Sequence, residues 1–545
     1  MRQIFLFSFI IIAICPFAVF SQQQYKYLSH SELEAALSAI ASQHSAIVSL
    51  KEIGKSAGGT TIHAVEIGVG ERSEKPAFLV IAGAEPDDLA STIAAKEFIR
   101  SLTADSLKSL LERVTIYVIP SLSPDAAQGY FATPKIALPG NAQADDADRD
   151  GAIDEDGAQD LNGDGLISVM RILDPNGDWM INPDDSSLMK KAEKRKGETG
   201  QFRLISEGKD DDHDGKVNED EIGGTNINRN FTFKYKPYQS DGGEYPFSSP
   251  EARILGEFLF AHTTILTVFT FEYCDNISES WKIATPEQQS GNNFASDSAS
   301  YSQTAAALKK HIRFTSKTDP PTGDIAQWAY YHGGRLSFTA PAWVYPTIAV
   351  DTSKDASKKG DDKKGSQDPD IRALKWIQKF SPSNFVSWKG FEHPDFAGMN
   401  VEIGGFAPFV LHNPPADSLS SVMASTSNLL LQLAEMMPAL SVAPPKVESL
   451  GNDIFRITVS ISNIGKLPTH TVVGRQVKGI RPLQSKGELA PGQKVLSGRA
   501  IQLFAEPLVS GATVQHTFLV SGKGDIRFTV GCPTAGFVKV TASTK

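Results

Sequence analysis

Residues 76–88, PAFLVIAGAEPDD, decide the fold expected for this chain. The stretch begins with a run of apolar residues between Pro76 and a glycine, a pattern typical of a buried central strand. Three carboxylates, Glu85, Asp87 and Asp88, follow on the loop at the carboxyl end of that strand. Because open α/β sheets bind their ligands at this edge, we expect these acids to lie at a ligand-binding edge of the sheet.

Helix and strand signals alternate on both sides of this stretch. The expected strands are 61–67, 76–81, 114–120, 266–271 and 336–339, and the expected helices are 29–42, 88–111, 249–261, 301–312 and 419–436. Such alternation is typical of an α/β domain with a mainly parallel sheet and crossover helices. We therefore assign residues 22–440 to one α/β domain.

The last hundred residues have a different pattern. Beyond Pro444 and Pro445 the chain consists of short alternating runs, such as FRITVSISN and DIRFTV, separated by Gly and Pro turns. About seven such strands in about a hundred residues predict an immunoglobulin-like β-sandwich over 445–545. A chain of 545 residues with 41% hydrophobic content can bury more than one core. We interpret the sandwich as a stabilising or docking module.

Residues 1–21 have the pattern of a signal peptide. One basic residue, Arg2, precedes a long apolar run, and Ser21 is a small residue suited to cleavage before Gln22. The alternative is an uncleaved membrane anchor, and no later run is long and apolar enough to span a membrane. We therefore predict an exported protein that is periplasmic, cell-surface or extracellular.

The net charge restricts the class of binding partner, and the cysteine content restricts the disulfide bonds that the chain can form. The net charge of −10 argues against a nucleic-acid partner, because phosphate binding requires a basic surface. Cys15 leaves with the signal peptide, and Cys274 and Cys532 remain. Two distant cysteines define no disulfide framework, so we expect two buried free thiols.

Two insertions interrupt the first domain. Between about residues 141 and 222 the periodicity disappears, and three segments have the alternating oxygen ligands and the glycine of a calcium-binding loop. The candidate ligands are Asp146, Asp148, Asp150 and Asp154 in the first segment, Asp160, Asn162, Asp164 and Ser168 in the second, and Asp210, Asp212, Asp214, Asn218 and Glu221 in the third. We expect calcium to hold an insertion that lacks an apolar core, and the alternative is a set of solvated acidic turns. The charged, Gly/Ser-rich insertion over about 353–370 is expected to be a flexible surface segment.

Only the third calcium segment fills every ligand position. Arg171 stands at the closing position of the second segment, and Gly157 at that of the first. Both could still bind calcium if a neighbouring loop supplies an oxygen ligand. Weak sites of this kind suit the millimolar calcium found outside cells.

Segments from about residue 28 to residue 440 resemble the zinc carboxypeptidases of the carboxypeptidase A type, in particular bacterial members with Asp-rich insertions. In family order they are IGKSAGGTTIHAVEIG (53–68), IAGAEPDD (81–88), VIPSLSPDAAQGY (118–130), TNINRNF (225–231), FTFEYCDN (269–276), GDIAQWAYYHGGRLSFTAPAW (323–343) and HPDFAGMNVEIGG (393–405). The resemblance implies a carboxypeptidase A-like mixed sheet flanked by helices. It also implies proteolysis by zinc, held by a His and a Glu of one loop and a distant His, with a separate Glu as general base.

The sequence departs from this family at every one of these positions. Glu85 stands in place of the first His, Asp88 in place of the Glu, and Glu272 in place of the third ligand, although a shift by one residue would place Phe271 there. Pro341 occupies the position of the general base. Three carboxylates without an imidazole suit calcium or magnesium better than zinc. We therefore do not expect hydrolysis by the family's route.

Three further residues are candidates for the site. Glu402 is the one remaining candidate base, although a strand carboxylate with a structural partner is the better interpretation. Asn228 and Arg229 match the pair that holds the peptide's C-terminal carboxylate in the family, a task suited to an amide and a two-donor guanidinium. The alternative is a buried pair that fixes the loop after the calcium segments.

These observations leave three hypotheses for the function. The first is an exported pseudoenzyme that binds a peptide or protein ligand, and the simultaneous loss of the zinc ligands and the base favours it. The second is an active zinc-dependent metallocarboxypeptidase with an altered site. The third is a calcium-stabilised structural surface module. An open cleft around Arg229 would favour the first hypothesis over the third.

Overall fold

The computed structural model describes residues 25–144, 157–211, 213, 215–218, 224–279, 295–346 and 368–545. The predicted signal peptide over 1–21 and most of the insertion 353–370 lie outside the described residues. Seven predicted calcium ligands also lie outside them, namely Asp146, Asp148, Asp150, Asp154, Asp212, Asp214 and Glu221. For these parts of the chain the sequence-based expectations stay predictions.

The first domain is built on a six-stranded mixed sheet with the order β1-β2-β4-β3-β9-β10. Its strands are β1 (Val48–Lys55), β2 (Thr61–Ile67), β3 (Ala77–Ile81), β4 (Thr115–Ile119), β9 (Ile265–Phe271) and β10 (Leu336–Ala340). Strands β4, β3, β9 and β10 are parallel, whereas β1 and β2 pair antiparallel. Strand β3 is central and buried along its whole length, which confirms the prediction for the opening stretch.

Helices cover both faces of this sheet. They include α1 (His30–Gln43), α2 (Leu89–Ser101), α3 (Lys108–Arg113), α4 (Pro124–Gln128), α5 (Pro250–Ala261), α6 (Ala295–Leu308), α7 (Ile325–Tyr331), α9 (Pro369–Phe380) and α10 (Leu419–Glu435). Successive side chains of a strand point to opposite faces. Phe78 and Val80 accordingly pack with α1, α2 and α10, whereas Leu79 and Ile81 pack with α5 and α7. The two faces bury separate cores, and the expected α/β fold is confirmed.

A second sheet corrects the expectation that residues 141–222 lack regular structure. Its order is β11-β12-β5-β8-β6-β7, with β5 (Val169–Leu173), β6 (Trp179–Ile181), β7 (Met189–Lys191), β8 (Phe202–Ser206), β11 (Phe385–Phe391) and β12 (Val401–Phe406). The expectation was wrong because these strands are short and bury only alternate residues around a small core. Met170 and Ile172 contribute to that core from the insertion, and Val401 and Ile403 contribute from more than two hundred positions later.

The C-terminal region is a sandwich of two antiparallel sheets. One has the order β13-β15-β19-β17 with β14 against β15, and the other has the order β18-β16-β20-β21. The strands are β13 (Leu440–Val442), β14 (Lys446–Gly451), β15 (Ile454–Asn463), β16 (Leu483–Glu488), β17 (Lys494–Ser497), β18 (Ile501–Phe504), β19 (Thr513–Ser521), β20 (Gly524–Cys532) and β21 (Gly536–Thr544). The predicted β-sandwich is confirmed. Cys274 and Cys532 are buried free thiols, also as predicted.

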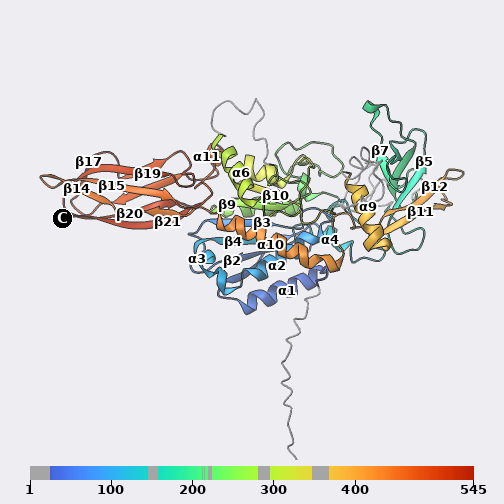
Figure 1. The fold of residues 1–545 in the computed structure, drawn as a ribbon, viewed down its shortest axis with the longest axis horizontal. Coiled ribbons are helices and arrows are strands. Elements are labelled where there is room, and N and C mark those ends of the chain that lie inside the picture. Colours follow the sequence, from blue (N-terminus) through green and yellow to red (C-terminus); the bar gives the residue numbers. More distant parts are fainter. Residues whose placement is uncertain are drawn as a thin grey trace, which may run out of the picture.

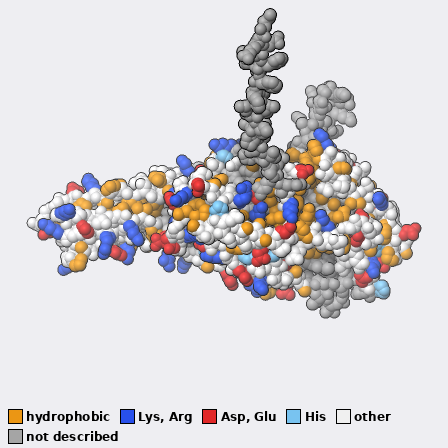
Figure 2. Space-filling view, turned by 90° about the horizontal axis from the view of Figure 1, so that it is seen from below, with side chains coloured by type: hydrophobic (Ala, Val, Ile, Leu, Met, Phe, Trp, Pro, Cys, Tyr) orange, Lys and Arg blue, Asp and Glu red, His pale blue; other side chains and the backbone are white. Residues whose placement is uncertain are grey.

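The three parts lie in a row. Figure 1 shows the central sheet in the middle of the long axis, with the sandwich at one end and the second sheet at the other. On the face shown in Figure 2, acidic and basic side chains are interspersed along this length. Among the described residues, no helix combines the length and the apolar character needed to cross a membrane.

Candidate functional site

Two acids follow the carboxyl ends of neighbouring central strands. Glu85 lies on the loop after β3, and Glu272 directly follows β9. Their side chains are buried, with 7% and 0% of the residue surface exposed. A third buried acid, Asp324, precedes α7 and is also fully buried. No pattern in the sequence marks Asp324 as a site residue, because an aspartate before a helix is an ordinary helix cap.

The start of α7 binds Glu272 and Asp324 through its backbone. The N–H of Ala326 donates to Glu272 Oε1 at 3.2 Å, and the N–H of Gln327 donates to Asp324 Oδ2 at 3.2 Å. The N–H of Ile325 donates to Asn228 Oδ1 at 2.9 Å. These donors have no partner within a helix, and they carry the positive end of its dipole. The carboxylates therefore stabilise the first turn of α7.

Asn228 connects Glu85 to the same network. Its Nδ2 donates to Glu85 Oε1 at 2.7 Å, while its Oδ1 accepts from the backbone at the start of α7. The Asn226 side chain also donates to Glu85, at 3.5 Å. Asn228 is completely buried. Its amide therefore bridges Glu85 and α7 rather than facing solvent.

Burial sets the protonation of this cluster. It raises the pKa of Glu85 to about 7, and it raises the pKa of Asp324 to about 7. It also raises the pKa of Glu272 well above its usual value, and the negative charges of Asp324 and Glu85 raise it further. Because carboxylates packed together in a dry environment cannot all ionise cheaply, the cluster retains protons near neutral pH.

Asp88 has a separate local role. Its carboxylate accepts from the Ser91 N–H at 2.9 Å and caps the N-terminus of α2. The side chain is buried, which raises its pKa to about 6. Asp88 thus turns toward its own helix, while Glu85 and Glu272 interact with the network at α7.

The residues at the former ligand positions do not fit zinc. Zinc sites in proteins use imidazole or thiolate donors in a compact tetrahedral arrangement. Here the donors are carboxylates, and each accepts hydrogen bonds from neighbouring protein groups. Over the described ranges, no three His, Cys, Asp or Glu side chains are grouped so as to hold a metal ion.

Asp87 belongs to a third arrangement, with Tyr273 and His412, which no pattern in the sequence indicates. Its carboxylate accepts from the Tyr273 hydroxyl, and it lies 2.8 Å from Nδ1 of His412. The His412 and Tyr273 rings stack with centroids 3.7 Å apart. Burial favours a higher pKa for Asp87, but His412 and Tyr273 outweigh it and lower that pKa. His412 lies in the loop LHNPP, where no pattern in the sequence marks it.

Arg229 faces an open cleft. The cleft has a volume of about 520 Å³, and its lining includes Arg229, Glu85 and Tyr273. The Arg229 guanidinium is partly exposed and lies 3.0 Å from a carboxylate oxygen of Asp241. Asn228 and Arg229, predicted to act as a pair, therefore face different surroundings. Arg229 lines the cleft, whereas the Asn228 amide is held inside the protein.

The positions considered for a general base hold no free carboxylate. Pro341 is buried directly after β10, in a segment without an ionisable neighbour in sequence. Glu402 lies on β12 of the second sheet, where its carboxylate accepts from Arg171 Nε at 2.8 Å. This ion pair confirms that Glu402 has a structural partner. Arg171, which stands at the closing position of the second calcium segment, is thus engaged with β12.

The described calcium candidates form tight Asp-rich turns. The Asp160 carboxylate accepts from the backbone N–H groups of Gly163 and Gly165 at 2.7 and 2.8 Å. Glu207 lies beside this turn and accepts from the N–H of Leu161 and from the Ser168 hydroxyl. Asn162 and Asp164 also accept from backbone N–H groups. In the third segment, the Asp210 carboxylate accepts from the backbone N–H groups of His213 and Gly215. The Asn218 side chain donates to Ser206 O.

Comparison with protein families identifies the first domain. The family described as zinc carboxypeptidase matches residues 33–345, which is more than half of the chain. The chain belongs to the zinc carboxypeptidase family. A domain of unknown function matches residues 439–543, the region of the sandwich. No curated protein sequence matches the chain.

Solved structures of the family are similar at low sequence identity. Bovine thrombin-activatable fibrinolysis inhibitor, in complex with tick carboxypeptidase inhibitor, is 13% identical, with 75% of this chain and 96% of that chain covered and a TM-score of 0.38. Carboxypeptidase A from Helicoverpa armigera is 14% identical, with coverages of 60% and 66% and a TM-score of 0.37. A metallo-carboxypeptidase from Burkholderia cenocepacia is 13% identical, with coverages of 58% and 60% and a TM-score of 0.30.

Proposed function

We propose that this protein is a catalytically inactive member of the zinc carboxypeptidase family that binds a peptide or protein ligand. The observation that carries the proposal is the use of Glu85 and Glu272 as hydrogen-bond acceptors in the network at the start of α7. Side chains that accept hydrogen bonds in this buried network are not available to hold a metal ion that would activate water. In addition, the general-base position is occupied by Pro341, whose side chain cannot accept a proton.

The cleft supports ligand binding rather than a purely structural role. Its volume of about 520 Å³ lies within the range of about 300–1,000 Å³ that is usual for ligand sites. Polar groups of Asn226, Gln239 and Thr318 line it beside Arg229, and such groups can bond to a peptide backbone. The predicted signal peptide supports a location outside the cytoplasm for this binding.

The purified protein is expected to contain no stoichiometric zinc and to release no C-terminal residues. The measurements are metal analysis by mass spectrometry and mass spectra of a mixed pool of unblocked octapeptides after incubation with zinc-supplemented protein. Equilibrium dialysis of the same pool should show selective retention of some peptides. Arg229→Ala should weaken that retention about ten-fold, since a charged hydrogen bond contributes about 1.5–3 kcal/mol.

The matched control is Arg253→Ala, which replaces an arginine outside the cleft. Stoichiometric zinc together with chelator-sensitive shortening of the peptides would overturn the proposal in favour of an active peptidase. No retention of any peptide would favour a structural module instead.

We also propose that calcium stabilises the insertion through the Asp160 turn and the neighbouring segments. The expected result is a higher melting temperature in millimolar calcium than in chelator, because a ligand at a hundred times its Kd stabilises by about 2.7 kcal/mol. Differential scanning calorimetry with calcium, magnesium and chelator measures it. Asp160→Ala should reduce the calcium effect, whereas Asp174→Ala, outside the three segments, should leave it unchanged. Equal melting temperatures in calcium and chelator would contradict the proposal.

A further inference from the structure

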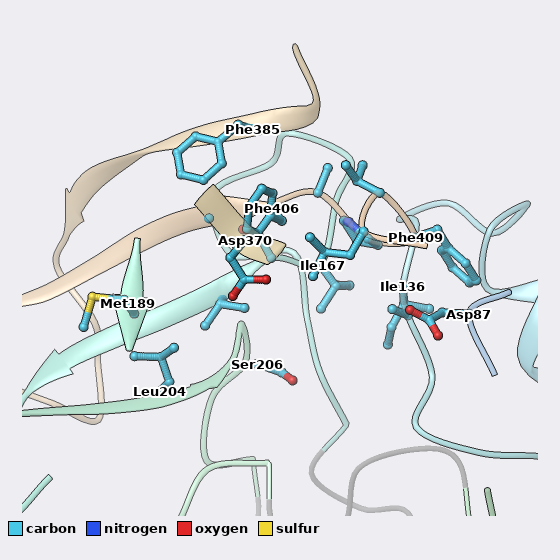
Figure 3. A pocket seen from close by; sticks show the side chains of 18 of the residues that line it. Asp87, Ile136, Ile167, Met189, Leu204, Ser206, Asp370, Phe385, Phe406 and Phe409 are labelled. Carbon is cyan, nitrogen blue, oxygen red and sulfur yellow. The ribbon is translucent and has the colours of Figure 1, made fainter. Parts of the chain in front are cut away.

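An apolar cavity lies between the second sheet and the segment 405–411. Its volume is about 380 Å³. Figure 3 shows its side chains, with Leu204 and Met189 on one side and Phe406, Ile167 and Phe409 on another. Its walls include residues of β5, β7, β8, β11 and β12, and the buried acids Glu85, Glu272 and Asp324 do not line it.

The indole of Trp388 in the wall is already engaged within the protein. The indole N–H of Trp388 donates to Ser187 O at 2.8 Å, and the Arg171 guanidinium lies over the Trp388 ring at 4.5 Å. The rings of Phe385 and Phe406 meet edge to face at 5.3 Å. Most of the remaining wall is apolar and aromatic surface, which favours a large apolar group.

Carboxylates are the only charged groups lining this cavity among the described residues. They belong to Asp370, near Phe406, and to Asp87, beside Ile136 and Phe409 (Figure 3). Asp87 is already paired with His412, so Asp370 is the carboxylate that is complementary to a positive charge next to the ligand's apolar group.

The cavity adjoins the cleft beside Arg229. Asp87, Ala137 and Pro139 line both spaces. The cleft adds the acids Asp241 and Asp319, while its arginine already pairs with Asp241. A ligand long enough to reach both spaces would meet apolar walls in the cavity and a mainly acidic, hydrogen-bonding surface in the cleft.

We propose that the cavity binds an aromatic or large aliphatic side chain of a peptide segment in which basic residues flank that side chain. This inference rests on the proposed function and deepens it by naming the class of ligand. An apolar anchor in a pocket supplies most of the affinity in such complexes, and surrounding charges select the partner. The polar cleft favours a peptide over a lipid, because a lipid tail would use the cavity alone.

Titration calorimetry with three blocked hexapeptides tests this. Each peptide is acetylated and amidated: the first has two central phenylalanines flanked by lysines, the second has glutamates in place of the lysines, and the third has alanines in place of the phenylalanines. The first should bind the full-length protein about ten-fold more tightly than the second or the third. Equal affinities for the three peptides would overturn the inference, and so would tighter binding of decanoate than of the first peptide.

Two variants locate the binding. Leu204→Trp fills the cavity and should lower the affinity of the protein for the first peptide about ten-fold. Gln201→Trp lies outside the cavity and should not change this affinity. Asp370→Asn is a surface change that should lower the affinity for the lysine peptide and leave the affinity for the glutamate peptide unchanged. Binding that is lost in Arg229→Ala but unchanged in Leu204→Trp and Asp370→Asn would overturn this inference and keep the proposed function. Release of C-terminal residues from unblocked peptides would overturn the proposed function alone.

Discussion

Glu85→Gln is expected to stabilise the protein at pH 8 by on the order of 2 kcal/mol, although it removes a charged group. The reason is that burial raises the pKa of Glu85 to about 7 in the folded protein, from about 4.3 in an unfolded chain. At pH 8 the folded state must hold a buried carboxylate, whereas the unfolded state holds the same charge in water. The amide of Gln has a similar shape and can still accept from Asn228 Nδ2.

The same argument fixes the direction of the pH dependence. A carboxyl group whose pKa is raised by folding binds its proton more tightly in the folded state. Its contribution is therefore most favourable below about pH 4, where both states are protonated, and it is lost as the pH rises from about 4 to about 7. The wild type should lose stability relative to Glu85→Gln across this window, and the difference should be constant above it.

Urea unfolding midpoints from pH 4 to pH 8 measure this difference, with the exposed Glu52→Gln as a matched control that should follow the wild type. A Glu85→Gln protein that is less stable than the wild type at pH 8 would contradict the prediction. It would also mean that the folded protein favours the charged form of Glu85, as a bound cation would. The result therefore bears on the proposed function as well as on the protonation of the cluster.

The central sheet was predictable because each of its strands is marked by a pattern of neighbouring residues in the sequence. Strand β3 is a continuous apolar run between Pro76 and Gly83, and burial on both faces of a sheet requires such a run. The second sheet was not predictable in the same way. Strand β5 pairs with β12, and a short strand that buries only Met170 and Ile172 has too little apolar pattern to be separated from an acidic loop.

The site was predictable only in part. Family order placed Glu85 and Glu272 after adjacent strands, and the structure finds both there. The burial of Asp324 depends on how α7 packs against β9 and β10, which the sequence near Asp324 does not encode. His412 lies far along the chain from Asp87, so their contact arises from tertiary structure alone.

Asp297→Ala is expected to separate the sandwich from the first domain. Asp297 on α6 is completely buried. Its carboxylate accepts from the backbone N–H groups of Val472 and Val473 at 2.9 and 3.1 Å, at the start of α11 (Val472–Gln476), and from the Tyr330 hydroxyl at 3.1 Å. The substitution leaves these donors without an acceptor in a buried interface. Since each hydrogen bond to a charged group contributes about 1.5–3 kcal/mol, we expect a loss of about 3–5 kcal/mol.

The interface has little capacity to compensate for this loss. The Thr471 hydroxyl donates to Gly334 O, and a Cβ placed on Gly334 would lie 2.4 Å from the Cα of Gly474. This close approach of two backbones leaves no room for a side chain to move in and replace the carboxylate. Differential scanning calorimetry should therefore show one transition for the wild type and two for Asp297→Ala, with faster proteolysis between the domains. Asp297→Asn keeps one oxygen acceptor, so its stability should lie between that of the wild type and that of Asp297→Ala. A single unshifted transition for Asp297→Ala would mean that apolar contacts alone hold the sandwich in place.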